Sequence, residues 1–345
     1  MAEYRAGIIG LGFIGAADQV SGDALGQRVE DLDGTHLVAL DRQAQVRVVA
    51  GSSRDEGRRV RFARRTGAKT YADWREMLEQ ERLDIVSVAT YTPTHEQITL
   101  ACAAAGVRAV YCEKPVAPCL AAGERMLRAC EEAGALLVFN HQRRFNPNYC
   151  RLRDLVSGGG LGQLTSINAQ WGSGRLGNVG THVLDAVCMV SGRRAEAVSG
   201  TLDLAGRPDC RGAAFRDPGG WGVVRLEGGL MGLVDAPDYS RAPYGIVFNG
   251  SEGRALAGGR DVQIEYWDGR REHWLSAVEE TSSMDRGVDE IVGWLEKGGT
   301  FSYPAVESLH VFEIIVAFHA SHARKAAWVE LPLTGPDRDL VVQSG

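Results

Sequence analysis

Three glycines near the start of the chain have the spacing of a phosphate-binding turn. Gly10, Gly12 and Gly15 form Gly-x-Gly-x-x-Gly directly after a short apolar run. The first would permit a tight turn after a buried strand, the second would let the backbone approach a pyrophosphate, and the third would let a helix pack against the strand. That helix, which begins near Phe13 and Ile14, would offer its free N–H groups to phosphate oxygens. We therefore expect a dinucleotide site here.

The residues after the second expected strand indicate which dinucleotide binds. An acidic residue usually stands at this position and binds the adenosine ribose hydroxyls. Ser52, Ser53 and Arg54 stand there instead. Two hydroxyls and a guanidinium suit a 2′-phosphate better than a bare diol. We therefore expect NADP, with NAD as the alternative if Arg54 only stacks on the adenine.

A parallel sheet is needed to bring these residues together. Apolar runs at 6–9, 46–50, 69–72, 85–89, 109–112 and 136–140 alternate with helical patterns at 55–66, 73–81, 94–105 and 119–133. This alternation predicts a doubly wound parallel sheet, which binds ligands beyond the carboxyl ends of its strands. Candidate cofactor residues follow the fourth and fifth strands: Thr90, Thr92, Pro93, His95, Glu113 and Lys114.

From about residue 160 the pattern changes to alternating segments separated by hairpin signals. Such segments flank residues 228–229, 250–253 and 268–269, and they predict an antiparallel sheet. Helices are expected at 181–190, 283–296 and 306–325. The predicted fold class is α/β, with a Rossmann domain at 1–140, an α+β substrate and oligomerisation domain at 141–334, and a loose or docking tail at 335–345.

Composition narrows the possible partners and compartment. The net charge is −6 and the basic residues are scattered, so neither nucleic acid nor an anionic membrane is expected to bind. No apolar run approaches the roughly 20 residues of a membrane span, and the first strand begins too early to leave room for a signal peptide. The seven cysteines lack paired spacing, which indicates free thiols in a reducing cytoplasm and no metal site.

Several motifs, taken in order, resemble one known family. They are Gly10-x-Gly12-x-x-Gly15, Thr92-Pro93 with His95, Glu113-Lys114-Pro115, Arg144-Phe145-x-Pro147, Gly180-Thr181-His182-Val183-Leu184-Asp185, and the closing run at 329–333. Together they resemble the glucose-fructose oxidoreductase/inositol dehydrogenase/MocA (Gfo/Idh/MocA) superfamily over nearly the whole chain. The resemblance implies a Rossmann domain, a second domain with an open antiparallel sheet, NAD(P)-linked oxidoreduction of a sugar or polyol hydroxyl, and homodimers or homotetramers built on that sheet.

The resemblance also assigns the proton transfer that must accompany hydride transfer at an alcohol carbon. It implies that Lys114, at a strand end beside the expected nicotinamide site, exchanges the hydroxyl proton. Partial burial and a neighbouring positive nicotinamide would both favour the neutral amine. Glu113 is the expected orienting partner of Lys114. The alternative is a surface Glu–Lys pair in a loop.

His182 and Asp185 are three residues apart and would share one helix face. The resemblance makes His182 a proton donor or acceptor, or a substrate ligand. Many family members carry an aspartate four residues before this histidine, whereas this chain has Asn178. Because an amide can hydrogen-bond but cannot take a proton, proton transfer would fall to Lys114 and His182. Asn178 and Asp185 would help to hold the substrate.

Three further residues are candidate substrate ligands, each with a structural alternative. Arg144 could bind an acidic or phosphorylated substrate, or it could bridge the two domains. Trp171 and Arg175 could line a sugar pocket, or Trp171 could be a buried strand residue.

Residues 18–33 make the first connection roughly a dozen and a half residues longer than in the family pattern, and long ordered segments near a site are often functional. Gln19, Ser21 and Asp23 could form a flap there, with an inert surface loop as the alternative.

The sequence therefore predicts a cytoplasmic NAD(P)-dependent dehydrogenase or reductase. Its substrate would be a secondary alcohol or ketone of a sugar, cyclitol or nucleotide sugar. One alternative is a non-catalytic NAD(P)-bound sensor, against which the pair Lys114 and His182 argues, because a binding module needs no acid–base groups. The other alternative is an NAD-assisted glycosidase, which a tight, non-exchanging cofactor would indicate.

Overall fold

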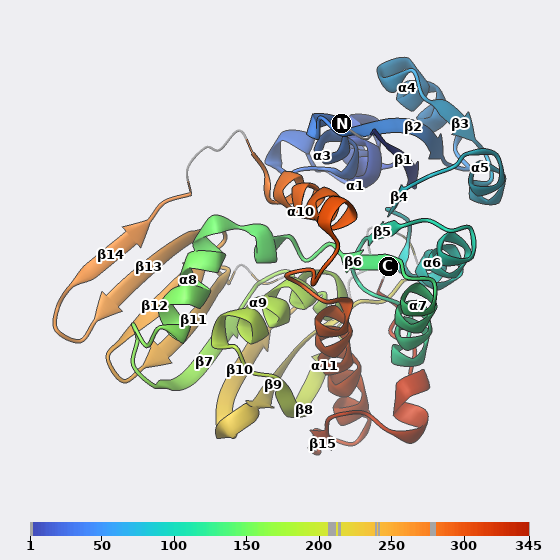
Figure 1. Ribbon diagram of the computed structural model, residues 1–345. Helices are drawn as coiled ribbons and strands as arrows, with labels where there is room; N and C mark the ends of the chain where they lie inside the picture. Colours follow the sequence, from blue (N-terminus) through green and yellow to red (C-terminus); the bar gives the residue numbers. More distant parts are fainter. Residues whose placement is uncertain are drawn as a thin grey trace. The chain divides into compact units, whose positions relative to one another are not determined.

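Apolar runs in the first 140 residues form a six-stranded parallel sheet in the computed structural model, which describes residues 3–205, 212, 215–238, 240, 242–276 and 281–344 (Figure 1). The strand order is β3-β2-β1-β4-β5-β6. The order therefore reverses between β1 and β4, where a doubly wound sheet binds its ligand. The strands are β1 Tyr4–Ile9, β2 Val46–Ser52, β3 Lys69–Tyr71, β4 Ile85–Val88, β5 Ala109–Cys112 and β6 Leu136–Phe139.

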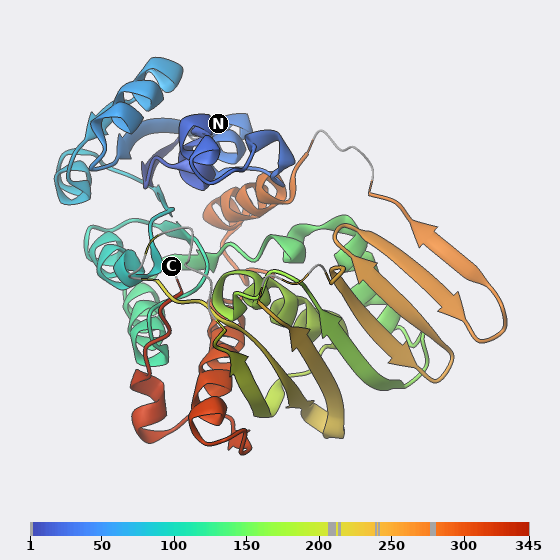
Figure 2. The same ribbon diagram turned by 180° about the vertical axis from the view of Figure 1, so that it is seen from behind.

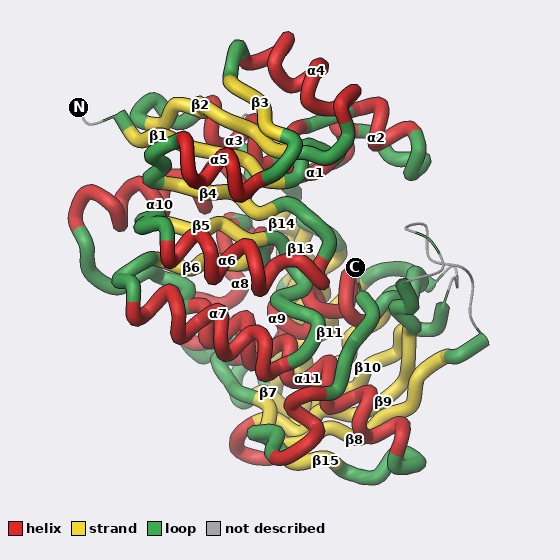
Figure 3. The backbone as a smooth tube through the Cα atoms, turned by 90° about the vertical axis from the view of Figure 1, so that its right-hand side faces the viewer, coloured by secondary structure: helices red, strands yellow, loops and turns green. Residues whose placement is uncertain are grey.

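Helices cover both faces of this sheet, with α3 and α10 on one face and α6 and α7 on the other (Figure 3). Helix starts follow the local sequence: Asp55 and Asp73 accept hydrogen bonds from the first turns of α4 and α5, and Ser282 forms a capping box with Asp285 on α10. The helices are α1 Phe13–Ala16, α2 Gln19–Asp23, α3 His36–Arg42, α4 Glu56–Thr66, α5 Trp74–Gln80, α6 His95–Ala104, α7 Leu120–Glu132 and α10 Ser283–Lys297, with short turns η1 Val29–Asp31 and η2 Thr92–Thr94.

The chain divides into two compact units. Unit 1 consists of Met1–Ala117, Ala122–Gln142 and Glu280–Val306, and unit 2 consists of Pro118–Ala121, Arg143–Glu279 and Glu307–Gly345. Helix α10, which was predicted in the second domain, belongs to unit 1 because its residues contact elements of the N-terminal sheet unit. Asp285 accepts a hydrogen bond from Arg42 at 2.8 Å, and the carbonyl of Leu295 accepts one from Arg108 at 3.0 Å.

Residues 18–33 are built into unit 1. Asp18 accepts two hydrogen bonds from Arg61 of α4, at 2.7 and 2.8 Å. Asp33 accepts from the backbone and the hydroxyl of Ser283 on α10, at 3.1 and 2.6 Å. The segment is thus held at both ends by helices distant in sequence. The flap role stays a prediction for three residues that bond within the segment: Gln19, Ser21 and Asp23.

Unit 2 contains a nine-stranded sheet in its described residues, with the order β14-β13-β12-β11-β7-β10-β9-β8-β15. Neighbouring strands are antiparallel except β7 and β10, which are parallel. The predicted fold class is confirmed: a Rossmann sheet is followed by an α+β part with a mostly antiparallel sheet. The strands are β7 Leu164–Gln170, β8 Ala195–Asp203, β9 Gly219–Leu226, β10 Leu230–Ala236, β11 Gly245–Gly250, β12 Gly253–Gly258, β13 Asp261–Tyr266, β14 Arg271–Trp274 and β15 Val329–Glu330.

Helices α8, α9 and α11 lie on one face of this sheet (Figure 1), and Figure 2 shows the opposite side. Along β12 and β13, side chains that face the helices are buried and alternate with outward side chains that are exposed or half-buried. The remaining elements are α8 Pro147–Ser157, α9 Thr181–Ser191 and α11 Ala305–Ala323, with short turns η3 Gln142–Phe145, η4 Leu176–Gly180, η5 Glu227–Gly229 and η6 Gly335–Asp339. No helix in the described part of the chain is long and apolar enough to cross a membrane.

Candidate active site

The three glycines of the motif differ in what a side chain at each position would contact. Gly10 has a φ of +102°, and a side chain there would meet the Ala89 carbonyl at 2.2 Å. A side chain on Gly15 would lie 1.9 Å from the carbonyl oxygen of Gly10. Gly12 differs, because the nearest atom to an added methyl group is Nη1 of Arg58 at 3.6 Å. Gly10 and Gly15 therefore let the turn form, and Gly12 leaves open space on it.

This open space fits a phosphate group. Phe13 and Ile14 begin α1 directly after Gly12, and the first N–H groups of a helix have no partner within it. Arg58, on the first turn of α4, faces the same space, and its side chain makes no hydrogen bond or ion pair with the described residues. By contrast, Arg61 binds Asp18. Arg58 was not predicted from the sequence, because only the fold brings α4 over the glycine turn.

The residues after β2 lie as expected for the adenosine end of a dinucleotide. Ser52 is buried, Ser53 is half-buried and Arg54 is exposed. The Ser53 hydroxyl accepts a hydrogen bond from the backbone of Asp55 at 3.2 Å. Arg59 holds the carbonyls of Ser53 and Arg54, at 2.7 and 3.0 Å. No acidic residue stands among these three strand-end positions.

The loops after β4 and β5 are joined by His95. Its buried ring lies between the carbonyl of Thr90, at 3.0 Å from Nε2, and that of Pro115, at 3.0 Å from Nδ1. Burial lowers the pKa of His95 below its ordinary value, although the hydrogen bonds to these carbonyls act to raise it. Pro93 is exposed, and Thr92 is buried with no hydrogen-bond partner for its Oγ1 among the described residues. His95 thus supports the lysine loop, and its direct contact with a cofactor stays a prediction.

A buried polar network lies beside Lys114 at the end of β5. Nε2 of His36 donates to Oε1 of Glu113 at 2.9 Å, and the side-chain amide of Asn140 donates to the same oxygen at 2.6 Å. Nδ1 of His36 lies 2.5 Å from Oγ of Ser87. His36 and Asn140 come from α3 and from the residue after β6. Neither residue was predicted from the sequence, because each is a single polar residue within an otherwise ordinary element.

Glu113 is therefore a fixed anion next to a half-buried lysine. Burial alone would raise its pKa, but the hydrogen bond and charge of His36, the charge of Lys114 and the hydrogen bond from Asn140 outweigh burial and lower it to about 2. The charge of Lys114 thus acts on Glu113, and the orienting role predicted for Glu113 stays a prediction. The order Ser87–His36–Glu113 resembles a hydrolase triad, but Ser87 and His36 are fully buried, so this serine cannot reach a substrate.

The substrate residues predicted from Arg144 onward in the chain all lie in unit 2. Asp185, on α9, is buried, and its Oδ1 is 2.9 Å from both Nε and Nη2 of Arg144. His182 is half-buried in the first turn of the same helix. Arg144 thus holds α9 through Asp185, whereas either a substrate role or a bridging role was predicted for it.

The turn before α9 is the π-helix η4, which contains Asn178. The backbone N–H groups of Gly177 and Asn178 donate to the carboxylate of Asp217 at 2.7 and 2.8 Å. Asp217 was also missed by the sequence analysis. Trp171 is 1% exposed and its indole N–H donates to the carbonyl of Gly174 at 2.6 Å. Arg175 has a φ of +57° at the start of η4.

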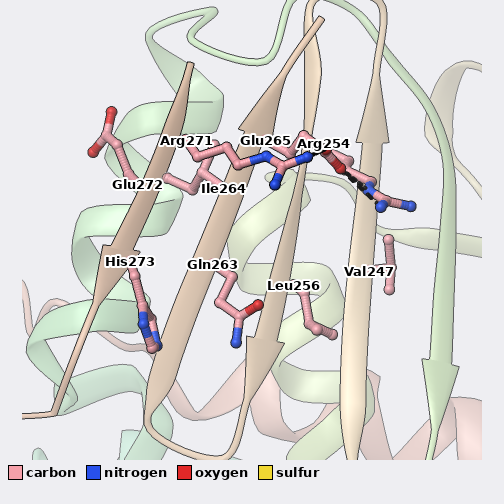
Figure 4. A pocket seen from close by; sticks show the side chains of 9 residues that line it. All are labelled: Val247, Arg254, Leu256, Gln263, Ile264, Glu265, Arg271, Glu272 and His273. Atoms are coloured by element: carbon pink, nitrogen blue, oxygen red, sulfur yellow. Dashed lines mark hydrogen bonds and ion pairs between the residues drawn. The ribbon is translucent and has the colours of Figure 1, made fainter. Parts of the chain in front are cut away.

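The outer face of the unit 2 sheet holds a hollow of about 610 Å³ over β11 to β14 (Figure 4). Arg254, Glu265 and Arg271 form a row across three strands, with 2.8 Å ion pairs on both sides of the carboxylate. Val247 and Leu256 lie beside this row. None of the residues that line the hollow is a predicted catalytic, cofactor or substrate residue.

A Rossmann sheet with an open phosphate turn, followed by an α+β unit, defines a dinucleotide-binding oxidoreductase. Residues 4–141 match the model of the GFO_IDH_MocA family, described as an oxidoreductase family with an NAD-binding Rossmann fold. This matched part of the chain, residues 4–141, belongs to the Gfo/Idh/MocA family. The predicted family and enzyme class are confirmed.

Related proteins agree with this assignment. The chain is 28% identical to a myo-inositol 2-dehydrogenase of Thermotoga maritima over 271 residues, which are 73% of this chain and 75% of that protein. A solved levoglucosan dehydrogenase in complex with NADH and levoglucosan has a TM-score of 0.78 at 21% identity, covering 96% of this chain and all of the other. The WlbA dehydrogenase of Bordetella pertussis, solved with NADH and UDP-GlcNAcA, has a TM-score of 0.75 at 20% identity, covering 96% and 100%.

Proposed function

We propose that this protein moves hydride between a nicotinamide cofactor and a secondary alcohol or ketone of a sugar, cyclitol or nucleotide sugar. The observation that carries the proposal is Lys114, placed at the carboxyl end of β5 beside the buried, ionised Glu113. A lysine held there by a fixed anion has the position that proton exchange with a substrate hydroxyl requires. The names of the relatives, an inositol dehydrogenase and a levoglucosan dehydrogenase, support this substrate class.

In the oxidative direction the substrate loses a hydride from carbon and a proton from oxygen. The nicotinamide cofactor, when bound, supplies the hydride acceptor. Nζ of Lys114 takes the hydroxyl proton, and the carboxylate of Glu113 stabilises the resulting ammonium. His182 is the second group proposed to exchange a proton or bind the substrate oxygen.

The other predicted substrate residues have supporting roles in this proposal. Asn178 offers an amide to a substrate hydroxyl, and Asp185 acts with Arg144 to hold the helix that carries His182. Trp171 and Arg175 shape the turn that contains Asn178, which is consistent with the burial of Trp171.

We propose NADP as the favoured cofactor. Ser52, Ser53 and Arg54 follow β2 without an acidic residue, and Arg58 faces the open glycine turn nearby. A guanidinium with no carboxylate partner suits a 2′-phosphate. NAD remains the alternative, since the solved relatives named above carry NADH.

We further propose a cytoplasmic homodimer or homotetramer that associates through the outer face of the unit 2 sheet. This face carries the hollow of Figure 4, where apolar side chains stand beside a self-complementary row of charges. Residues of both signs in one row can pair with the same row of a second copy related by a two-fold axis.

The variant Lys114→Met tests the catalytic proposal. We expect turnover to fall at least about 100-fold, equivalent to about 3 kcal/mol in the barrier, because methionine fills the space but cannot exchange a proton. Lys297→Met, an exposed lysine of α10, is the matched control. The assay follows NAD(P)H formation with a panel of cyclitols, sugars and nucleotide sugars, and calorimetry measures cofactor affinity, which should not change.

The two alternatives give different results in the same experiment. A sensor would bind the cofactor but turn over no substrate in the panel. A glycosidase would cleave glycosides without net change in NAD(P)H. Full activity of Lys114→Met would refute the role of this lysine.

A further inference from the structure

The end of the described chain is buried against the turn that precedes α9. Val342 and Ser344 are each 1% exposed, whereas Val341, the first residue of this segment, is 60% exposed. The backbone N–H of Val342 donates to the carbonyl of Pro118 at 2.9 Å, and the carbonyl of Gln343 accepts from the backbone of Arg216 at 3.1 Å. All of these residues belong to unit 2. Residues 341–344 are therefore an integral part of this unit.

Gly177 shows how closely this segment approaches η4. A Cβ on Gly177 would lie 2.3 Å from Cβ of Ser344, 2.5 Å from its Oγ, and 3.0 Å from Oδ1 of Asp217. The φ of Gly177 is not in the left-handed region, so backbone conformation does not require glycine here. Glycine is required because Ser344 occupies the space of a side chain.

Asp217 connects the segment and the turn. Its carboxylate accepts the N–H groups of Gly177 and Asn178, and the preceding residue, Arg216, is the backbone partner of Gln343. The next residue, Pro218, accepts the N–H of Leu176 at 2.9 Å. Residues 216–218 thus hold the segment on one side and η4 on the other.

We propose that residues 341–344 are a positioning segment for the substrate site, acting through η4 on Asn178 and His182. The turn η4 leads directly into α9, whose second residue is His182. A π-helical turn is rare, and such turns are frequent at functional sites. Packing of Ser344 on Gly177 holds the shape of this turn, and small displacements of a positioned group reduce turnover strongly. This inference rests on the proposed function of His182 and Asn178.

A double-mutant cycle tests the contact. The variants are Gly177→Ala, deletion of residues 341–345, and both changes together. We expect each single change to lower kcat/KM for the substrate about ten-fold or more through displacement of the turn. Cofactor affinity should stay unchanged, because the glycine turn and β2 lie in unit 1. The double variant should be no worse than the deletion alone, because the methyl group no longer meets Ser344.

Gly293→Ala is the control, since no atom lies within 4 Å of a Cβ at that helical position, and it should behave as the wild type. Additive losses in the double variant would overturn the proposal, as would a deletion variant with kcat/KM within about two-fold of the wild type.

Hydrogen exchange separates this inference from the proposed function. The deletion should increase exchange at residues 176–182 and leave β1, β2 and α4 unchanged. If the wild type turns over no substrate, increased exchange at 176–182 still supports the positioning role, and the proposed function alone fails. Unchanged exchange at 176–182 overturns the positioning role even if the enzyme is active.

Discussion

At the scale of single residues, the charge of Glu113 is the best-defined feature of the candidate site. Its Oε1 accepts hydrogen bonds from His36 and Asn140, and together with Lys114 these groups offset the cost of burying a carboxylate. A buried charge that is fully hydrogen-bonded can persist where an unpaired charge could not. Lys114 therefore has a neighbouring anion whose position does not depend on a bound substrate.

This network predicts a pH dependence of stability. The pKa of Glu113 is about 2 in the fold, below its ordinary value of 4.5. Its contribution is complete above about pH 4.5 and is lost as the pH falls from there towards 2, by up to about 3 kcal/mol. Glu113→Gln should remove this part of the acid dependence and should be less stable at neutral pH, because its amide N–H₂ faces donors. Urea unfolding at about pH 5 and pH 3 measures both effects. Equal acid dependence in both proteins would contradict the prediction.

Arg58 is expected to contribute to the preference for NADPH over NADH. We expect Arg58→Gln to weaken NADPH binding about ten-fold or more, with a smaller effect on NADH, because a charge-assisted pair with the 2′-phosphate is lost. Arg64→Gln is the matched control, since Arg64 is exposed on the same helix. Calorimetric titration with both cofactors measures the change. An equal loss for NADPH and NADH would place Arg58 at the pyrophosphate, and no loss would remove it from the site.

At the scale of elements, the β1–α1 turn contains two kinds of glycine: those that the fold requires and one that a bound ligand would require. Gly10 and Gly15 have no room for a side chain, whereas a methyl group on Gly12 would meet only the end of the flexible Arg58 side chain. The same short motif thus contains residues that the fold needs and one that a ligand needs.

The variants Gly12→Ala and Gly15→Ala should therefore differ. Gly12→Ala should fold with a melting temperature close to the wild type and lose cofactor affinity at least about ten-fold, because the methyl group fills the phosphate space. Gly15→Ala should lower the free energy of unfolding by about 2 kcal/mol or more, because a backbone carbonyl must move. Thermal unfolding and calorimetry distinguish the two. Normal cofactor binding by a well-folded Gly12→Ala would argue against a dinucleotide at this turn.

At the scale of the whole molecule, the outer face of the unit 2 sheet carries exposed apolar side chains in the described part of the chain. Leu256 and Leu233 are 36% and 47% exposed on it. Apolar side chains on one sheet face beside the charged row of Arg254, Glu265 and Arg271 are typical of a surface that a second subunit covers.

Leu256→Glu tests this surface. We expect the variant to sediment as a smaller species than the wild type at the same concentration. The reason is that the two introduced glutamates would face each other, buried, across each two-fold interface. Val60→Glu, on an exposed site of α4, is the control and should leave the sedimentation coefficient unchanged. A wild type that sediments as a monomer would contradict the predicted oligomer.

Features that depend on neighbours in the chain were predictable from the sequence alone. These are the alternation of strands and helices, the glycine turn after β1, and the hairpins at 228–229 and 268–269. Each follows from hydrophobic periodicity or turn chemistry within about ten residues. Lys114 and His182 were found because short motifs surround them.

Only the tertiary structure decided which side chains meet. His36 and Glu113 are 77 residues apart in the chain, and Arg144 and Asp185 are 41 apart. Arg58 reaches Gly12 only because α4 packs beside β2 and β3, and α10 joins unit 1 through residues more than 200 positions away. Pairings of this kind depend on how sheets and helices close long loops, and single polar residues carry no periodic signal. The sequence therefore determined the elements and the candidate reacting groups, while packing decided the partners that hold those groups in place.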